Sequence, residues 1–86
     1  MNKFTEGQIE AIKQVTNTFI DRKMNYLNEG EEFLKRFNSG RMAENIECEL
    51  VNKRNHMFKI TNEITVKDIT DICESILIEE LKKRGI

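Results

Sequence analysis

Apolar residues in the first part of the chain recur every three or four positions, which is the spacing of one face of an α-helix. Thr5 and Gln8 have the spacing of a capping box, in which each side chain bonds the backbone N–H of the other residue. We therefore expect a helix that begins at Thr5 and follows the apolar pattern to Asn38. The apolar members of this pattern are Ile9, Ile12, Phe19, Ile20, Met24, Leu27, Leu34 and Phe37.

The length of this predicted helix raises a question about its middle. An uninterrupted helix from Thr5 to Asn38 would be about 50 Å long at 1.5 Å per residue, whereas a compact domain of this size measures about 30 Å across. Gly30 is a weak helix former, and Asn28 and Glu31 have the spacing of a second capping box. Either the helix breaks near Gly30, or it continues and pairs with a second copy of the chain. The Asn-Ser-Gly sequence at 38–40 predicts its end.

Residues 45–61 alternate between apolar and polar side chains, which is the pattern of half-buried β-strands. The polar residues 52–55 divide this segment, so we expect a β-hairpin with its turn there. A single hairpin is marginally stable in water and has two open edges. It must therefore pack on the helices, pair with a second copy or accept a strand from a partner. The side chains expected to share faces of the hairpin are Ile46, Cys48 and Leu50 in the first strand, and Phe58 and Ile60 in the second.

A second helical pattern follows Thr65, which has capping-box spacing with Asp68. Gly85 is a typical terminator for this helix. The order helix, strand, strand, helix predicts one α+β domain over residues 1–86, with both helices covering one face of the hairpin in two layers. The apolar stripe of the C-terminal helix consists of Val66, Ile69, Ile72, Cys73, Ile76, Leu77 and Leu81.

Charge and composition limit the classes of function. The chain has 86 residues and a net charge of −1, so no overall field steers it toward nucleic acid or membrane. No apolar run approaches the roughly 20 residues of a membrane span, and the N-terminus lacks the apolar stretch of a signal peptide. We therefore expect a cytoplasmic protein, in which both cysteines are reduced thiols.

Residues suited to catalysis or metal binding are scarce. His56 is the one histidine, and a nucleophilic Cys48 or Cys73 would need such a base at hydrogen-bond distance. Cys48 could approach His56 across the predicted hairpin, but a solvated histidine is the simpler interpretation. Glu47 and Glu49 share a strand face without a second strong metal ligand such as another histidine. We expect no enzyme activity, no metal and no cofactor.

The predicted N-terminal helix carries more apolar surface than one hairpin and one helix can cover. Its aromatic residues Phe19, Tyr26, Phe33 and Phe37 widen the stripe, and aromatic side chains are favoured at interface cores. A bend at Gly30 that folds this surface into the core is the alternative. The first hypothesis is a non-enzymatic regulator or inhibitor that binds a protein, of the kind that phage and mobile-element genes encode. Its contacts would be these aromatics or the free edge of the hairpin, and homodimer formation is compatible with them.

Basic residues gather near the predicted hairpin turn. Lys53, Arg54 and Lys59 lie in a stretch without acids, and Arg41 and His56 add to it. Such residues can contact phosphates, although so small a number of cations would bind nucleic acid weakly and in a salt-dependent way. The alternative hypothesis is therefore a weak nucleic-acid-binding accessory protein that uses these five residues.

Overall fold

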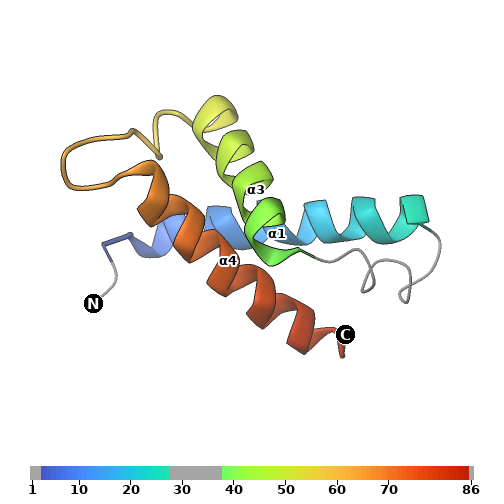
Figure 1. The fold of residues 1–86 in the computed structure, drawn as a ribbon. Helices are drawn as coiled ribbons and strands as arrows, with labels where there is room; N and C mark the ends of the chain where they lie inside the picture. The colour runs from blue at the N-terminus through green and yellow to red at the C-terminus, as the bar shows by residue number, and fades with distance from the viewer. Residues whose placement is uncertain (1–2, 28–37, 86) are drawn as a thin grey trace.

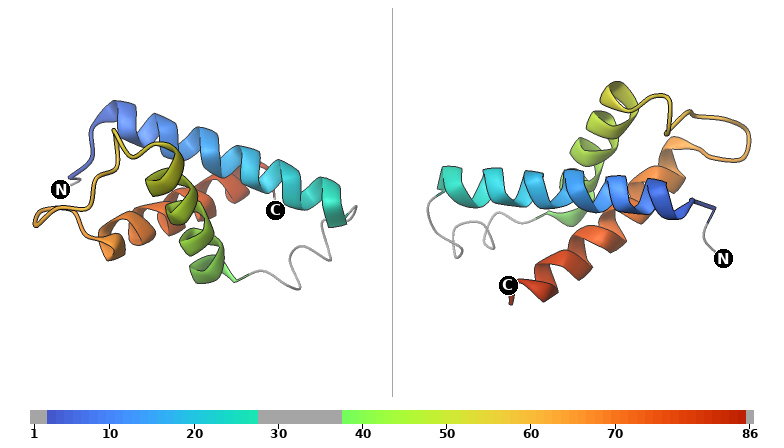
Figure 2. Two further views of the ribbon diagram at one scale, coloured as in Figure 1. Left: turned by 90° about the horizontal axis from the view of Figure 1, so that it is seen from above. Right: turned by 180° about the vertical axis from the view of Figure 1, so that it is seen from behind.

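The computed structural model of the chain is a bundle of helices around one apolar core (Figure 1). The structure describes residues 3–27 and 38–85, and for residues 24–27 it describes the helix alone. Within these ranges the helices are α1 (Glu6–Leu27), α3 (Ser39–Lys53) and α4 (Val66–Lys83). Each of the three contacts the other two, and α1 runs across the pair formed by α3 and α4 (Figure 2).

The predicted α+β fold is wrong, because the described part of the chain contains no β-strand. Residues 45–53, predicted as the first strand and the start of the turn, belong to α3, and the predicted second strand is a loop. Residues four apart share a face in both a helix and a strand, so Ile46 and Leu50 satisfy either pattern. Both are fully buried, whereas Cys48 between them is exposed. Ala43 is also buried and continues the stripe at helical spacing.

Asn38 begins α3, although the Asn-Ser-Gly sequence predicted the end of the preceding helix. Its backbone is extended, with φ −133° and ψ 102°, and its side-chain Oδ1 accepts a hydrogen bond from the Arg41 amide at 3.0 Å. Asparagine is favoured both as an N-cap and near helix ends, so residue type alone does not separate the two roles. Whether the first helix continues through Gly30 lies outside the described residues.

Both predicted capping boxes are confirmed. The Thr5 amide donates to Gln8 Oε1 at 2.9 Å, and the Gln8 amide donates to Thr5 Oγ1 at 3.1 Å. At the start of α4 the corresponding bonds between Thr65 and Asp68 measure 2.9 and 3.2 Å. The backbone N–H of Thr65 stabilises the Asp68 carboxylate and lowers its pKa. Gly85 ends α4 with a φ of 77°, a left-handed conformation that favours glycine.

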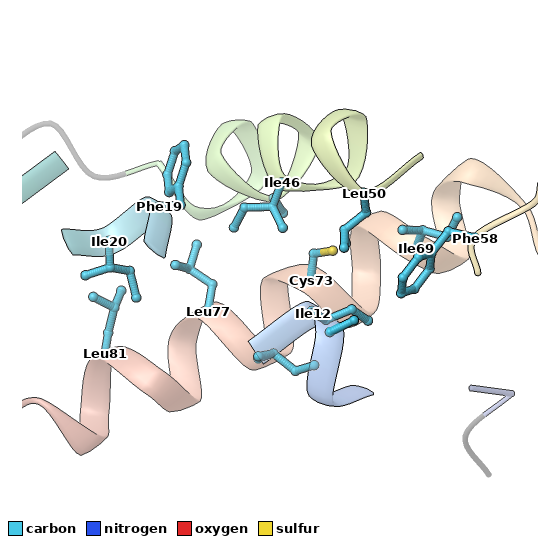
Figure 3. Close-up of a cluster of buried hydrophobic side chains, with 13 residues drawn as sticks. Ile12, Phe19, Ile20, Ile46, Leu50, Phe58, Ile69, Cys73, Leu77 and Leu81 are labelled. Carbon is cyan, nitrogen blue, oxygen red and sulfur yellow. The ribbon is translucent and has the colours of Figure 1, made fainter. Parts of the chain in front are cut away.

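The core lies where the three helices meet (Figure 3). Ile46 and Leu50 point from α3 toward Cys73 and Leu77 of α4 (Figure 3). Val66, predicted in the apolar stripe of α4, is the first residue of that helix and is exposed instead. The buried apolar residues are Ala11, Ile12, Phe19, Ile20, Ala43, Ile46, Leu50, Phe58, Ile69, Cys73, Ile76, Leu77 and Leu81.

The loop between α3 and α4 is anchored by Phe58. Its side chain is only 1% exposed, and its ring centroid lies 6.5 Å from that of Phe4. Gln8 Nε2 donates to the carbonyl of Met57, which ties the loop to α1. Ile60, expected on the same strand face as Phe58, is 53% exposed. The loop is therefore held by one buried aromatic side chain and not by strand pairing.

Polar contacts join the C-terminal end of α4 to α1. Arg84 donates to Asp21 Oδ1 at 2.6 Å and to Asn17 Oδ1 at 2.9 Å. Asn17 in turn donates to Glu80 Oε1 at 3.1 Å, and Lys83 lies 3.2 Å from Glu80 Oε2. Burial acts to raise the pKa of Glu80, but the hydrogen bonds from Asn17 and Lys83 outweigh it and lower that pKa. Glu80 therefore stays ionised at neutral pH within this network.

Substitutions at residues 46 and 48 separate the helix from the predicted strand, because a strand would place both side chains on one buried face. Ile46→Ala should lower the free energy of unfolding by about 2–4 kcal/mol, the usual result of removing a buried isoleucine side chain. Cys48→Ala should change it by less than about 0.5 kcal/mol, since this side chain is exposed. Urea unfolding followed by circular dichroism measures both values. Equal losses from the two variants would contradict the helical assignment.

Candidate functional site

A surface groove of about 480 Å³ lies between α1 and the C-terminal end of α3. Val15, which packs against the core, is its apolar member. The other described residues of the lining are polar or charged and come from α1, α3 and the loop that follows α3. The lining residues are Gln14, Val15, Thr18, Glu49, Lys53, Arg54 and His56.

Arg54 occupies the point where α3 ends and the loop begins. Its backbone N–H donates to the carbonyl of Leu50 at 2.8 Å, and its own carbonyl accepts from the amides of Met57 and Phe58 at 2.8 and 3.1 Å. These bonds hold its backbone in place. Its side chain is half-buried, and among residues 3–27 and 38–85 the guanidinium has no hydrogen-bonding or ion-pair partner. A guanidinium carries five N–H donors, which are here left for water or a ligand.

Lys53 and Glu49 form an ion pair one turn apart on α3. The Lys53 Nζ lies 3.1 Å from Glu49 Oε1, with the lysine side chain 70% and the glutamate side chain 23% exposed. A pair this exposed contributes less than about 1 kcal/mol to stability. It keeps the Lys53 ammonium beside Glu49 in the lining of the groove. His56, which is exposed in the turn after Arg54, also lines the groove.

The structure brings together three of the five residues predicted for nucleic-acid binding. Lys53, Arg54 and His56 line the groove, and Lys59 is exposed farther along the loop. Arg41 lies in the first turn of α3, about 18 Å from Lys53 along the helix axis at 1.5 Å per residue. The five residues therefore do not form one continuous basic face.

The four aromatic residues predicted to bind a partner are placed differently. Phe19 is part of the core, with 8% of its surface exposed, and Lys23 Nζ lies 5.5 Å from its ring centroid. Tyr26 lies in α1, but its side chain is outside the described residues, as are Phe33 and Phe37. A binding role for these residues stays a prediction. The free hairpin edge, the other predicted contact surface, is ruled out by the helical structure of residues 45–53.

Sequence reasoning missed the α1 side of the groove and the role of Glu49. Glu49 and Lys53 are four residues apart, which is the spacing of neighbours on one helix face. A helical interpretation of residues 39–53 would have paired them. Val15 and Thr18, in contrast, reach the groove only through the packing of α1 against α3, which leaves no local signal in the sequence.

Neither cysteine has the surroundings of an activated nucleophile. A hydrogen bond with Glu47 and the charge of that residue raise the pKa of the exposed Cys48. Burial, with a smaller effect from Glu47, raises the pKa of Cys73 to about 12. Cys48 and His56 line different grooves, so the approach that a hairpin would have allowed does not occur. Both thiols are protonated at neutral pH, and the thiolate is the reactive form.

The described residues contain no metal site and no helix that could span a membrane. No group of three His, Cys, Asp or Glu side chains within residues 3–27 and 38–85 is arranged to hold a metal ion. None of the three helices combines the length and apolar character that crossing a bilayer requires.

Comparison with protein-family models, with curated proteins and with solved structures gave no match.

The two thiols should react differently with an alkylating reagent. Iodoacetamide should modify Cys48 in the folded protein, with a pH–rate inflection above that of a free cysteine because the pKa of Cys48 is raised. Cys73 should react only after unfolding. Mass spectrometry of digested protein over a pH series measures both rates. Fast modification of Cys48 at neutral pH, or of Cys73 in the native state, would contradict this account of the thiols.

Proposed function

We propose that this chain is a small non-enzymatic protein that regulates a partner protein by binding it in the cytoplasm. The observation that carries the proposal is the groove between α1 and α3. There the apolar side chain of Val15 and the basic residues Lys53, Arg54 and His56 are accessible on one surface. Proteins bind ligands preferentially at concave surfaces, and this groove offers one apolar side chain and several polar ones.

Charge favours a protein over a nucleic acid as the partner. Glu49 lines the groove beside the basic residues, and the net charge of the chain is −1. Non-specific nucleic-acid binding depends on several cations that follow the phosphate backbone. Arg41 lies at the opposite end of α3 from the groove, so it does not extend the basic group. Nucleic acid is therefore the second candidate, supported by the three basic residues at the groove.

Affinity purification of the tagged protein from cells that naturally produce it tests this function. We expect a protein partner that remains after nuclease treatment and that binds again when both proteins are purified. Sedimentation velocity then gives the stoichiometry and shows whether the chain alone is a homodimer. Loss of all bound material after nuclease treatment would contradict the proposal and favour the nucleic-acid alternative.

Two matched variants locate the contact surface. Thr18→Trp places a large side chain in the groove, whereas Ser75→Trp places the same side chain on the exposed surface of α4. The first should weaken partner binding at least about tenfold, a free-energy change of about 1.4 kcal/mol, and the second should leave it unchanged. Equal affinity of both variants, with unchanged helical circular dichroism, would move the contact surface away from the groove.

A further inference from the structure

We infer that the groove between α1 and α3 binds an acidic peptide segment of the partner. Arg54 would hold a carboxylate of this segment, with Lys53 and His56 beside it, and an apolar side chain of the segment would pack on Val15. The inference rests on the proposed function and adds the chemistry of the partner.

The charge of the groove supports an anionic occupant. The Arg54 guanidinium is half-buried beside the groove and has no acidic partner among the described residues. Its planar donors match the two oxygens of a carboxylate, and such pairs are frequently bidentate. Glu49, the acid among the described lining residues, is paired with Lys53 at 3.1 Å and not with Arg54. The Arg54 guanidinium is therefore a positive group without an acidic partner in the described part of the chain, and a ligand can neutralise it.

The end of α3 does not require the Arg54 side chain. The backbone N–H of Arg54 reaches the carbonyl of Leu50, and the amides of Met57 and Phe58 reach the carbonyl of Arg54. These bonds complete the helix end through the backbone alone. The positive side chain still offsets the negative end of the helix dipole, so its removal affects stability to some extent. The test therefore includes, as a control, a variant that removes a cation from the last turn of α4.

The size and lining of the groove favour a peptide over a nucleic-acid strand. A groove of about 480 Å³ is within the size range of ligand-binding pockets in proteins. A peptide segment with one carboxylate and one apolar side chain can contact both Arg54 and Val15. A strand of nucleic acid needs a series of cations, and Arg41 is about 18 Å from Lys53 along α3.

His56 provides a direct probe of this groove, because it is the one histidine of the chain and gives one set of imidazole proton signals. We would titrate the protein with a short blocked peptide of glutamate and leucine, and with the same peptide carrying glutamine for glutamate. The glutamate peptide should shift the His56 signals to saturation, and added salt should weaken its binding. The glutamine peptide should bind at least tenfold more weakly.

Variants of Arg54 test its role in the wild-type groove. Arg54→Gln should weaken binding of the glutamate peptide about tenfold, while Arg54→Lys should retain part of the affinity through its charge. The matched control is Lys82→Gln, which removes an exposed cation from the last turn of α4 and should leave binding unchanged. Thermal unfolding of each variant separates loss of binding from loss of fold, and the wild-type titration gives a result independent of any variant.

Several results would overturn the inference. Absence of any His56 shift with the glutamate peptide would do so, as would equal binding of the two peptides. Tighter binding of single-stranded oligothymidylate than of the glutamate peptide would assign the groove to nucleic acid. A purified protein partner whose affinity is unaffected by Arg54→Gln would overturn this inference while leaving the proposed function in place.

Discussion

The packing of α3 on α4 is the interaction on which the rest of the structure depends. Ile46 and Leu50 are fully buried in this interface, opposite Cys73 and Leu77 (Figure 3). Burial of each large aliphatic side chain contributes about 1.5–3 kcal/mol. An isolated helix of this length is marginal in water, so this packing, together with the Asn38 cap, holds residues 39–53 in the helical state.

The position of α3 in turn determines the surface of the molecule. Where α3 ends, Arg54 begins the loop, and the burial of Phe58 fixes the course of that loop beside α1. The groove is the space left between α1 and this end of α3, with Val15 on one side and Arg54 on the other. A hairpin in the same place would have offered an open strand edge for pairing. The backbone groups of a helix are already hydrogen-bonded within the helix. A partner would therefore contact the side chains of α3 and would be recognised by their charge and shape.

The sequence predicted correctly the features that depend on hydrogen bonds between residues close together in the chain. The capping boxes at Thr5 and Thr65 join residues three apart, and both helix starts are confirmed. The fold class was wrong because Ile46 and Leu50 fit two periods, and the packing of α3 on α4, together with the Asn38 cap, selects the helical one. Adjacent basic residues such as Lys53 and Arg54 were identified, but Val15 joins them only through tertiary structure.

Carbon-13 chemical shifts of the Cα atoms test the central claim most directly, because their deviations from random-coil values have opposite signs in helices and strands. The packing account predicts positive deviations throughout residues 39–53, where α3 lies, and slow amide exchange at Ile46 and Leu50, whose side chains are buried. Negative deviations from Asn45 to Leu50 would show an extended strand. That result would contradict both the helical assignment and the groove that depends on it.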